Sequence, residues 1–447
     1  MTSAQSDRRV ERPSPWHARS DSTYARLFKP GSVHRDLYVD PALFAAEMRD
    51  LFGSTWVYVG HESEIPNAND FVTRTIGRRP VIVTRDADGS VHVLINRCTH
   101  RGATVCRATK GNASRFMCGY HAWTYKNDGQ CIGIPMKNAY GTTETKGRSL
   151  QRAAVATYRS FIFASVSEDV PPIEEHLAGA KTLLDQWLDR GDRLPVIVRN
   201  GDMQFQTHAN WKTVYDNAGD GYHPPFSHDS MLRVFAKRYG DTDMQYYRND
   251  FDQTDMVVLD LGNGHTVIDQ RPEMHAVSAW ERQHVQPGRE VLGRRLADQL
   301  GKERALAMLD SSTGSGLNLN IFPNLLIIGN QIQLLEPVAV NRTVVHWFST
   351  TLDGAPREIN AIRMRMQEDF PSFGEVDDTA QFESCQSGME DVPELEWIDI
   401  SRHMNTGTGR IGPLGYWAEP ISSDLHMRCY YAAWRDIMER AGRRNAK

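Results

Sequence analysis

Residues 98–121 read CTHRGATVCRATKGNASRFMCGYH, and candidate metal ligands lie at both ends of this stretch. It begins with Cys98-Thr99-His100 and ends with Cys118-Gly119-Tyr120-His121. Short runs rich in Val, Ile, Tyr and Phe surround it from Trp56 to Val166, separated by Asp-Gly turn signals. Such runs are typical of β-strands joined by tight turns. The pattern predicts an all-β module whose loops present these four side chains.

Two kinds of metal site use two cysteines and two histidines. Zinc fingers pair cysteine with cysteine and histidine with histidine around one tetrahedral ion. A [2Fe–2S] cluster of the Rieske kind has two cysteines on one iron and two histidines on the other. Here each loop carries one cysteine and one histidine, so each loop has to reach both irons. The spacing favours the iron–sulfur cluster, with Cys98, His100, Cys118 and His121 as ligands.

With these residues and their flanks, His100-Arg101-Gly102 and Tyr120-His121-Ala122-Trp123, the sequence resembles the Rieske non-haem iron ring-hydroxylating oxygenases, large (α) subunit. The resemblance covers nearly the whole chain, from the helix before Trp56 to residues 428–434. Histidine ligands raise the reduction potential above that of all-thiolate clusters, so the cluster acts as an electron relay. The resemblance therefore implies a second site, where the substrate chemistry takes place.

The second candidate site lies in residues 210–228, NWKTVYDNAGDGYHPPFSH. Non-haem Fe(II) oxygenases hold iron with two histidines and one carboxylate. His223 and His228 would point about 140° apart on a continuous helix, and Pro224-Pro225 interrupts that helix so that both rings can converge. Asp220 precedes His223 by one helical turn and can accept from its imidazole N–H. The run is similar to the family signature D-x₂-H-x₄-H.

The third ligand has to come from a distant part of the chain. Residues 373–378, FGEVDD, resemble the family stretch in which the second Asp binds iron, which implies Asp378. Asp377 is the nearest alternative, and Glu375 and Glu383 are further ones. The resemblance also implies that Asp220 bridges to a Rieske histidine of a neighbouring subunit, here His121. Asn217, Tyr222 and His265 are candidate pocket residues.

The fold class expected from these patterns is α+β. Residues 1–54 form an N-terminal helical segment with a helix over 42–52, and residues 55–168 form the Rieske domain. Residues 169–447 form the catalytic domain, an antiparallel sheet covered by helices. Helices are predicted at 174–189, 288–309 and 423–441. Residues 407–412 match G-x-G-x-x-G, but no strand precedes them, so they are interpreted as a glycine-rich loop and not as a nucleotide site.

The family resemblance implies a terminal oxygenase. Its cofactors would be one [2Fe–2S] cluster and one Fe(II) per subunit; the cluster would pass electrons to the iron, which activates O₂ and hydroxylates an aromatic ring. The product would be a cis-dihydrodiol, or a phenol if one oxygen is delivered. The chain has no nicotinamide, flavin or plant-type ferredoxin motif, so a ferredoxin or flavin reductase is expected as partner. The family assembles as trimers, often with a small β subunit.

The composition excludes several other classes of protein. The 447 residues include 51 Lys+Arg and 56 Asp+Glu, a net charge of −5, with 40% apolar and 24% charged residues. Nothing indicates a disordered, fibrous, nucleic-acid-binding or membrane-spanning chain. The N-terminal residues are polar and the six cysteines are few for disulfides, so a cytoplasmic protein is predicted.

The substrate is the least determined part of the prediction. Residues 311–335 carry no charge and alternate in their second half like a sheet that lines a pocket. Lys237, Arg238 or Arg233 could hold an acid group, which leaves a neutral or carboxylated aromatic as substrate class. A Rieske monooxygenase, a non-catalytic Rieske electron carrier and a zinc-stabilised interaction protein are the alternatives.

Overall fold

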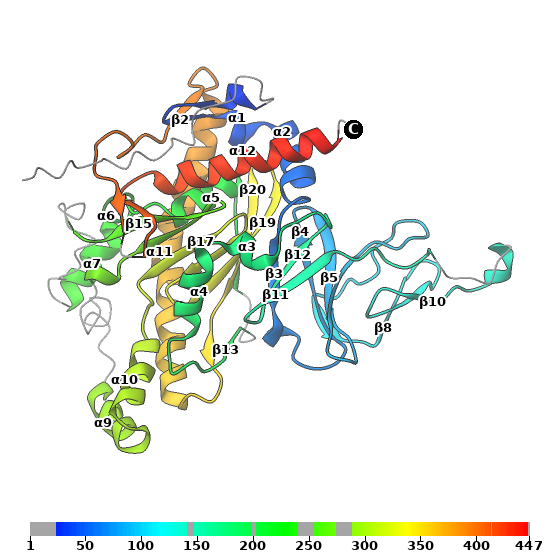
Figure 1. Cartoon of the computed structure of the whole chain (residues 1–447), viewed down its shortest axis with the longest axis horizontal. Coiled ribbons are helices and arrows are strands. Elements are labelled where there is room, and N and C mark those ends of the chain that lie inside the picture. The colour runs from blue at the N-terminus through cyan, green and yellow to red at the C-terminus, as the bar shows by residue number, and fades with distance from the viewer. Residues whose placement is uncertain are drawn as a thin grey trace, which may run out of the picture.

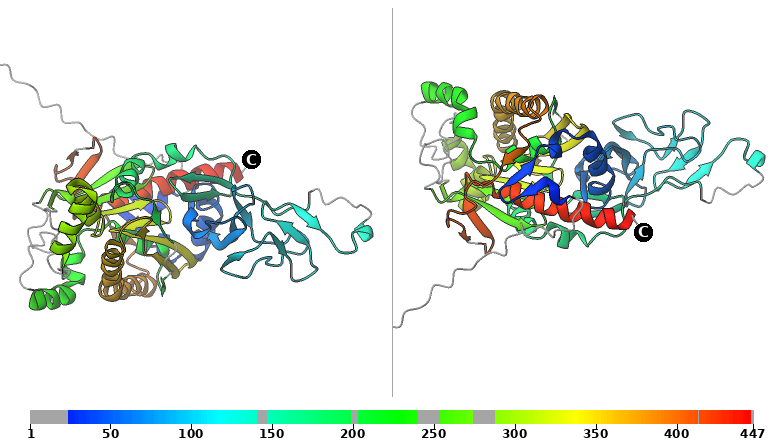
Figure 2. Two further views of the ribbon diagram at one scale, coloured as in Figure 1. Left: turned by 90° about the horizontal axis from the view of Figure 1, so that it is seen from below. Right: turned by 90° about the horizontal axis from the view of Figure 1, so that it is seen from above.

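The computed structural model describes residues 24–140, 147–198, 203–239, 254–273, 288–412 and 414–445. An elongated β-module extends from a larger body of sheet and helices (Figures 1 and 2). The N-terminal segment contains η1 (Ala25–Leu27), β1 (Phe28–Lys29), β2 (Ser32–His34), α1 (Asp36–Val39), α2 (Pro41–Ala46) and the π-helix η2 (Glu47–Leu51). The helix predicted over 42–52 is thus present as α2 and η2.

The β-module is built from three antiparallel sheets, with strand orders β6-β5-β4-β7, β10-β9-β8 and β11-β12-β3. Its elements are β3 (Val57–His61), η3 (Glu62–Glu64), β4 (Asp70–Ile76), β5 (Arg79–Arg85), β6 (Val91–Ile95), β7 (Lys110–Asn112), β8 (Arg115–Met117), β9 (Thr124–Lys126), β10 (Cys131–Gly133), η4 (Lys137–Tyr140), β11 (Ala154–Tyr158) and β12 (Phe161–Ser165). The prediction of an all-β module is confirmed.

The body is organised around a nine-stranded antiparallel sheet in the order β14-β20-β19-β18-β17-β16-β15-β24-β23. Its strands are β14 (Met203–Thr207), β15 (Val257–Gly262), β16 (His265–Asp269), β17 (Leu317–Ile321), β18 (Leu325–Ile328), β19 (Gln331–Ala339), β20 (Arg342–Phe348), β23 (Arg410–Ile411) and β24 (Trp417–Pro420). Smaller pairings use β13 (Val196–Ile197), β21 (Thr351–Leu352) and β22 (Trp397–Asp399). The predicted α+β class is confirmed.

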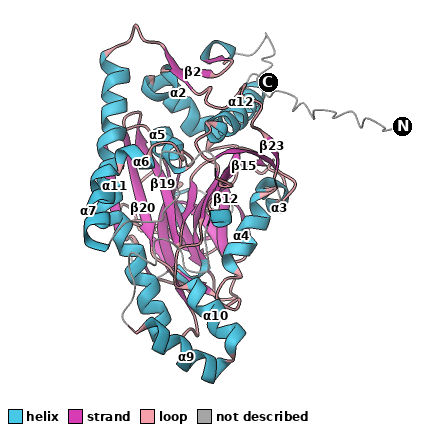
Figure 3. Ribbon diagram, turned by 90° about the vertical axis from the view of Figure 1, so that its left-hand side faces the viewer, coloured by secondary structure: helices cyan, strands magenta, loops and turns pink. Residues whose placement is uncertain are grey.

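Helices lie on both sides of this sheet (Figure 3). They are α3 (Ile173–Leu177), α4 (Ala180–Leu188), α5 (Trp211–Ala218), α6 (Pro224–Ser227), α7 (Asp229–Tyr239), α9 (Arg289–Leu300), α10 (Lys302–Ser311), α11 (Arg357–Asp391) and α12 (Leu425–Asn445), with the short η7 (Arg271–Glu273). The helix predicted at 174–189 is broken at Ala178, where φ is +46°, and the one at 288–309 is broken at Gly301, where φ is +86°. The 35-residue α11 is not among the predicted helices.

Alternation along β17 decides which side of the sheet faces the second candidate site. Leu317, Leu319 and Ile321 are buried in a core cluster with α4, which covers one face. Asn320 points to the other face, where its side-chain amide donates to the Ala218 carbonyl at the end of α5 (3.4 Å). Side chains two residues apart share a face of a strand, so α5 lies over the polar face of β17.

One hydrophobic core cluster contains residues from all three parts of the chain. Phe52 from the N-terminal segment, Val83 from the β-module, and Trp211 and Tyr430 from the body belong to one cluster of buried side chains. The β-module is therefore fixed to the body through its base.

The glycine-rich loop forms no nucleotide-binding turn. Residues 407–412 are a bend followed by β23, and a side chain at Gly409 would lie 2.2 Å from the Trp417 ring. None of the helices that the structure describes is long and apolar enough to span a membrane.

Candidate metal centres

The two loops at residues 98–103 and 118–123 have the same backbone hydrogen bonds. The Gly102 N–H donates to the Cys98 carbonyl (2.9 Å), and the Ala122 N–H donates to the Cys118 carbonyl (2.9 Å). Each cysteine N–H in turn donates to the carbonyl five residues ahead (2.8 Å in both loops). Each loop closes through a residue in the left-handed region, Gly102 at φ +78° and Ala122 at φ +55°. The loops thus present their cysteine and histidine in equivalent ways.

The four side chains converge at the end of the β-module. Cys98 and Cys118 are buried, and the His100 and His121 rings lie 4.5 Å apart. His100 Nδ1 is buried and has no hydrogen-bond partner, which is costly for an imidazole nitrogen unless another group binds there. Two thiols and two imidazoles are the donor set of a Rieske cluster, so the residues present fit that group.

Aromatic side chains contact the cluster donors, and the contacts differ from one donor to the next. The buried Tyr125 hydroxyl lies 3.1 Å from Cys98 Sγ. Trp123 stacks on His100 at 4.8 Å and 5°, and the Tyr140 hydroxyl lies 3.3 Å from His100 Nε2. His121 contacts the exposed ring of Tyr120 at 3.8 Å. Tyr125 and Tyr140 were not among the site residues predicted from the sequence; the position of Tyr125, four residues after His121, was the available signal.

The second centre brings together His223, His228 and Asp378. Their ligand atoms all lie within 4.8 Å of one another. Asp378 Oδ1 is 3.5 Å from His223 Nε2 and 3.3 Å from His228 Nε2. Ligands about 2.0–2.2 Å from one ion lie roughly 3–3.5 Å apart, so this spacing fits one divalent metal. His228 and Asp378 are buried, and His223 is partly exposed.

Local sequence explains how the histidines reach this position. Asn210 caps α5 by accepting from the Lys212 N–H (3.1 Å), and α5 ends at Ala218 with Gly219 as its C-cap. A side chain at Gly219 would lie 2.0 Å from the His426 ring, and one at Gly221 would lie 2.4 Å from the Ile421 carbonyl oxygen. Glycines at both positions let the turn that carries Asp220 lie against the start of α12 and the segment before it.

The short helix α6 separates the two histidines. It begins at Pro224, and His223 precedes it as the N-cap while His228 follows it as the C-cap. Proline favours the first turn of a helix, so Pro224-Pro225 begins α6 and does not interrupt a helix as predicted; the break lies earlier, where α5 ends at Ala218. The rings lie 5.4 Å apart at an angle of 73°.

Among the four acidic candidates on α11, the structure places only Asp378 against both Nε2 atoms. Asp377 Oδ2 instead lies 3.4 Å from His228 Nδ1. Glu383 accepts from the His208 backbone N–H (2.9 Å). Glu375 is buried, and burial raises its pKa well above the usual value.

The pKa values of Asp378 and Asp220, two carboxylates at this centre, are shifted in opposite directions. Burial raises the pKa of Asp378, although the nearby histidines partly oppose the shift. Burial acts in the same direction on Asp220, but the hydrogen bond and charge of His223 outweigh it and lower the pKa of Asp220. Asp220 Oδ2 lies 3.4 Å from His223 Nδ1. Asp220 thus stays ionised beside one histidine.

The remaining candidates lie at different distances from the centre. The Asn217 amide nitrogen is 3.2 Å from His223 Nε2 and 3.3 Å from Asp378 Oδ1. Tyr222 is exposed, and the Arg402 guanidinium lies 3.8 Å from its ring centroid. His265 is buried, with Nε2 donating to the His176 carbonyl (2.8 Å) and Nδ1 accepting from the Phe322 N–H (2.9 Å). Both nitrogens of His265 are therefore engaged by the backbone.

Two of the three basic residues considered for an acid group, Arg233 and Lys237, have exposed side chains on α7. Arg233 pairs with Asp229 on α7 at 2.8 Å, and its side chain is 79% exposed. Lys237 is also exposed, and the Arg238 side chain lies outside the described residues. The charge-free stretch 311–335 does form sheet, as β17, β18 and part of β19.

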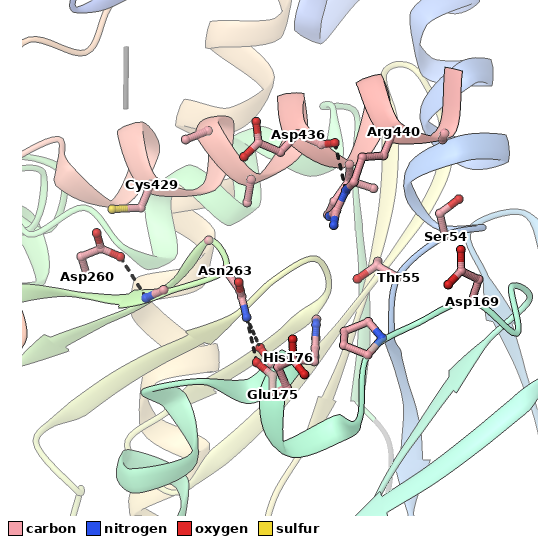
Figure 4. A pocket seen from close by; sticks show the side chains of 17 residues that line it. Ser54, Thr55, Asp169, Glu175, His176, Asp260, Asn263, Cys429, Asp436 and Arg440 are labelled. Carbon is pink, nitrogen blue, oxygen red and sulfur yellow. Dashed lines mark hydrogen bonds between the residues drawn. The ribbon is translucent and has the colours of Figure 1, made fainter. Parts of the chain in front are cut away.

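A separate cavity of about 390 Å³ lies between α12, α3 and the β15–β16 turn (Figure 4). It is lined by Asp169, Glu175, Asp260 and Asp436, with Arg440 as a counter-charge. Ser54 and Thr55, where the chain enters the β-module, also line it. None of the candidate metal ligands lies in its wall.

Two family models match this chain, one in the β-module and one in the body. Residues 55–159 match the family model of the Rieske [2Fe-2S] domain, and residues 194–440 match that of the ring hydroxylating alpha subunit catalytic domain. The naphthalene 1,2-dioxygenase structure with bound indole has the same fold, with a TM-score of 0.75 at 22% identity over 92% of this chain and 94% of that one. The Rhodococcus sp. naphthalene 1,2-dioxygenase structure gives a TM-score of 0.74 at 27% identity, covering 91% of this chain and 94% of that one.

Two relatives whose names state an activity align with most of this chain. The anthranilate 1,2-dioxygenase large subunit of Acinetobacter baylyi is 34% identical over 388 residues, 83% of this chain and 80% of the relative. The 2-halobenzoate 1,2-dioxygenase large subunit of Burkholderia cepacia is 33% identical, covering 82% of this chain and 79% of the relative. With two matching domains and these relatives, the chain belongs to the large, alpha subunits of the Rieske ring-hydroxylating oxygenases, enzymes that carry a [2Fe–2S] cluster and a mononuclear iron.

Proposed function

We propose that this chain dihydroxylates an aromatic acid to a cis-dihydrodiol, as the terminal component of a multicomponent dioxygenase. The relatives that cover most of the chain support the substrate class, because their names specify anthranilate, 2-halobenzoate and toluate. The observation that carries the proposal is the convergence of His223, His228 and Asp378 in a chain that also holds the cluster donors. Adding both atoms of O₂ to a ring requires two electrons and two protons in addition.

In this proposal the residues divide into two ligand sets. Cys98, Cys118, His100 and His121 hold the cluster, and His223, His228 and Asp378 hold the iron. When bound, the cluster supplies electrons singly and the iron supplies the activation of O₂. Three protein ligands would leave coordination positions of the iron open, as two histidines and one carboxylate do in non-haem Fe(II) oxygenases.

The protein positions these groups and controls the access of water. Asn320 on the polar face of β17 donates to the Ala218 carbonyl at the end of α5, and the Asn217 amide of α5 donates to Asp378 Oδ1. The buried state of His228 and Asp378 keeps solvent from the ligand atoms. A water-poor site strengthens the electrostatic interactions within it.

We further propose that electrons enter the iron site from the side of Asp220. Asp220 is partly exposed and lies next to His223, so a histidine of another subunit can reach it. His121 suits this contact better than His100, since the Tyr140 hydroxyl lies 3.3 Å from His100 Nε2. The family resemblance implies a trimer, a small β subunit, and a ferredoxin or flavin reductase as donor.

Metal analysis followed by product analysis tests the function. The purified chain should contain three irons and two acid-labile sulfides, two irons in the cluster and one at the second site. Cys98→Ser should lose the visible cluster spectrum, while His223→Ala and Asp378→Ala should keep it and lose the third iron. Zinc without colour, or two irons in the wild-type chain, would contradict the assignment.

Turnover with ¹⁸O₂ and a surrogate reductase decides between the two oxygenase chemistries. Benzoate, anthranilate and toluates are compared with biphenyl and naphthalene. A cis-diol of an acid that contains two labelled atoms is the expected product. A monooxygenase is the second candidate, because the alpha subunit of an N,N-dimethyl phenylurea N-demethylase is 39% identical over 219 residues. One labelled atom, or N-demethylation of a phenylurea, would favour it.

A further inference from the structure

His228 is held by two carboxylates that follow one another on α11. Its Nε2 lies 3.3 Å from Asp378 Oδ1, and its Nδ1 lies 3.4 Å from Asp377 Oδ2. The ring is almost completely buried. Both nitrogens of this imidazole therefore face an acidic oxygen.

Helix geometry separates the tasks of the two aspartates. Consecutive side chains on an α-helix point about 100° apart, so they reach opposite edges of one ring more readily than one point in space. Asp377 therefore lies outside the group of three ligand atoms, although it adjoins Asp378 in sequence. Its distance to Nδ1 is that of a weak hydrogen bond to a ring N–H.

We propose that Asp377 is a positioning residue that fixes the tautomer and the orientation of His228. This inference rests on the proposed iron site. A proton on Nδ1, donated to Asp377, leaves the Nε2 lone pair directed toward the metal. A carboxylate on the far nitrogen also makes the imidazole a stronger ligand, and such contacts typically change metal affinity 10–100-fold.

The other histidine provides a matched comparison. His223 Nδ1 lies 3.4 Å from Asp220 Oδ2, the same distance as in the His228–Asp377 pair. Asp220, however, is carried by the turn after α5 and lies beside the partly exposed His223, whereas Asp377 is carried by α11 and serves the buried His228. Asp377 should therefore affect the metal alone, while Asp220 should also affect the entry of electrons.

The test compares Asp377→Asn, Asp377→Ala and Asp220→Asn in the complete protein with its cluster assembled. Fe(II) affinity is measured by competition with a chelator, and the iron site is probed by the electron paramagnetic resonance spectrum of its nitric oxide adduct. Asp377→Ala should bind Fe(II) 10–100-fold more weakly and change the shape of that spectrum. The Fe(II) affinity of Asp377→Asn should lie between those of wild type and Asp377→Ala, because the amide oxygen of Asn still accepts from His228 Nδ1.

Several results would overturn the proposal. Wild-type Fe(II) affinity in Asp377→Ala would remove the positioning role. Complete loss of binding at saturating Fe(II), with retention of iron in Asp378→Ala, would make Asp377 the ligand instead. An unchanged cluster spectrum in the variants verifies that they fold. If the wild-type chain itself bound no Fe(II), the proposed function would fail first, so the two failures can be distinguished.

Discussion

The Tyr125 hydroxyl lies 3.1 Å from Cys98 Sγ and 3.2 Å from Thr99 Oγ1. Thr99 donates its own proton to the Arg148 carbonyl (2.7 Å), and a metal-bound Cys98 thiolate has no proton, so the single Tyr125 proton goes to one of these two acceptors, of which Sγ is the nearer. A hydrogen bond to a cluster sulfur stabilises the reduced, more negative state. A single buried hydroxyl can therefore adjust the driving force for electron transfer.

Tyr125→Phe should lower the midpoint potential of the cluster. A hydrogen bond that differs between redox states by on the order of 1 kcal/mol shifts a one-electron potential by about 40 mV. The potential is measured by redox titration of the cluster's visible absorbance. Thr99→Val serves as the control, since it leaves the bond to sulfur intact and should not lower the potential. An unchanged potential in Tyr125→Phe would show that Tyr125 donates to Thr99.

Residue-level prediction from sequence was strongest where the ligands are close together in the chain. C-x-H and C-x-x-H define a donor set by spacing alone, and His223 and His228 are separated by one short helix. Asp378 comes from a helix about 150 residues further on, so only the family resemblance pointed to it. Asp377 appeared as a competing ligand because sequence does not show which nitrogen of a ring a carboxylate faces.

At the scale of elements, the two cluster loops are closed by the same hydrogen bonds but with different residues. Gly102 has φ +78°, and a side chain there would lie 3.1 Å from the Arg97 guanidinium. Ala122 occupies the equivalent place at φ +55°. A non-glycine residue in this region costs roughly 1–2 kcal/mol, so the second loop is less favourable than the first.

Ala122→Gly should stabilise the second loop or leave it unchanged, whereas Ala122→Val should destabilise it. A β-branched side chain disfavours the left-handed region more strongly than alanine does. The rate at which the cluster absorbance disappears on heating is the measurement. Faster loss in Ala122→Gly than in wild type would mean that the alanine methyl group makes a contact worth more than the backbone strain.

The element that sequence reasoning missed, α11, explains where local patterns fail. Pro371 and Gly374 lie inside it, and both normally argue against an uninterrupted helix. In the structure α11 packs against α5, α6 and α10, and tertiary contacts of this kind override local propensity. The strands of the nine-stranded sheet were easier to predict, because the alternation of apolar and polar residues along a strand is a local pattern.

At the scale of the molecule, a buried ion pair joins distant parts of the chain. Lys212 Nζ lies 2.8 Å and 3.0 Å from the two Glu47 oxygens, and both side chains are fully buried. The Trp211 and Trp434 indole N–H groups also donate to Glu47 (3.1 and 2.8 Å). The N-terminal segment, α5 and α12 therefore share one polar centre inside the common core.

Lys212→Met should destabilise the protein by about 3–5 kcal/mol, since it leaves Glu47 as a buried charge without its cation. Chemical denaturation followed by tryptophan fluorescence gives the free energy of unfolding. Arg233→Met removes an exposed ion pair and should change that energy by less than about 1 kcal/mol. Equal effects of the two substitutions would contradict the structural role of the buried pair.

Asp216 should make the stability of the fold depend on pH. It accepts from Tyr38 (2.8 Å) and Tyr430, and burial raises its pKa to about 7. An unfolded Asp has a pKa of about 3.9, so from about pH 4 to 7 the folded chain holds a proton that the unfolded chain has released. This contribution is complete below about pH 4 and is lost as the pH rises through 7.

Asp216→Asn should therefore flatten the unfolding free energy between about pH 4 and 7, because Asn keeps an acceptor for the tyrosines and does not titrate. Denaturation midpoints of the variant and of wild type are compared at several pH values. The same slope in both proteins would mean that other groups cause the pH dependence.

The contact between Glu47 and Trp434 joins residues 387 positions apart in the chain. During synthesis, residues emerge at about 5–20 per second, so Glu47 leaves the ribosome roughly 20–80 s before its partner. Until α12 emerges, α2 and η2 lack part of the cover of the apolar side chains Leu43, Phe44, Met48 and Leu51, which in the finished protein are buried. A nascent chain in this state presents apolar surface that chaperones can bind, and the cover of that surface is completed when α12 packs against η2.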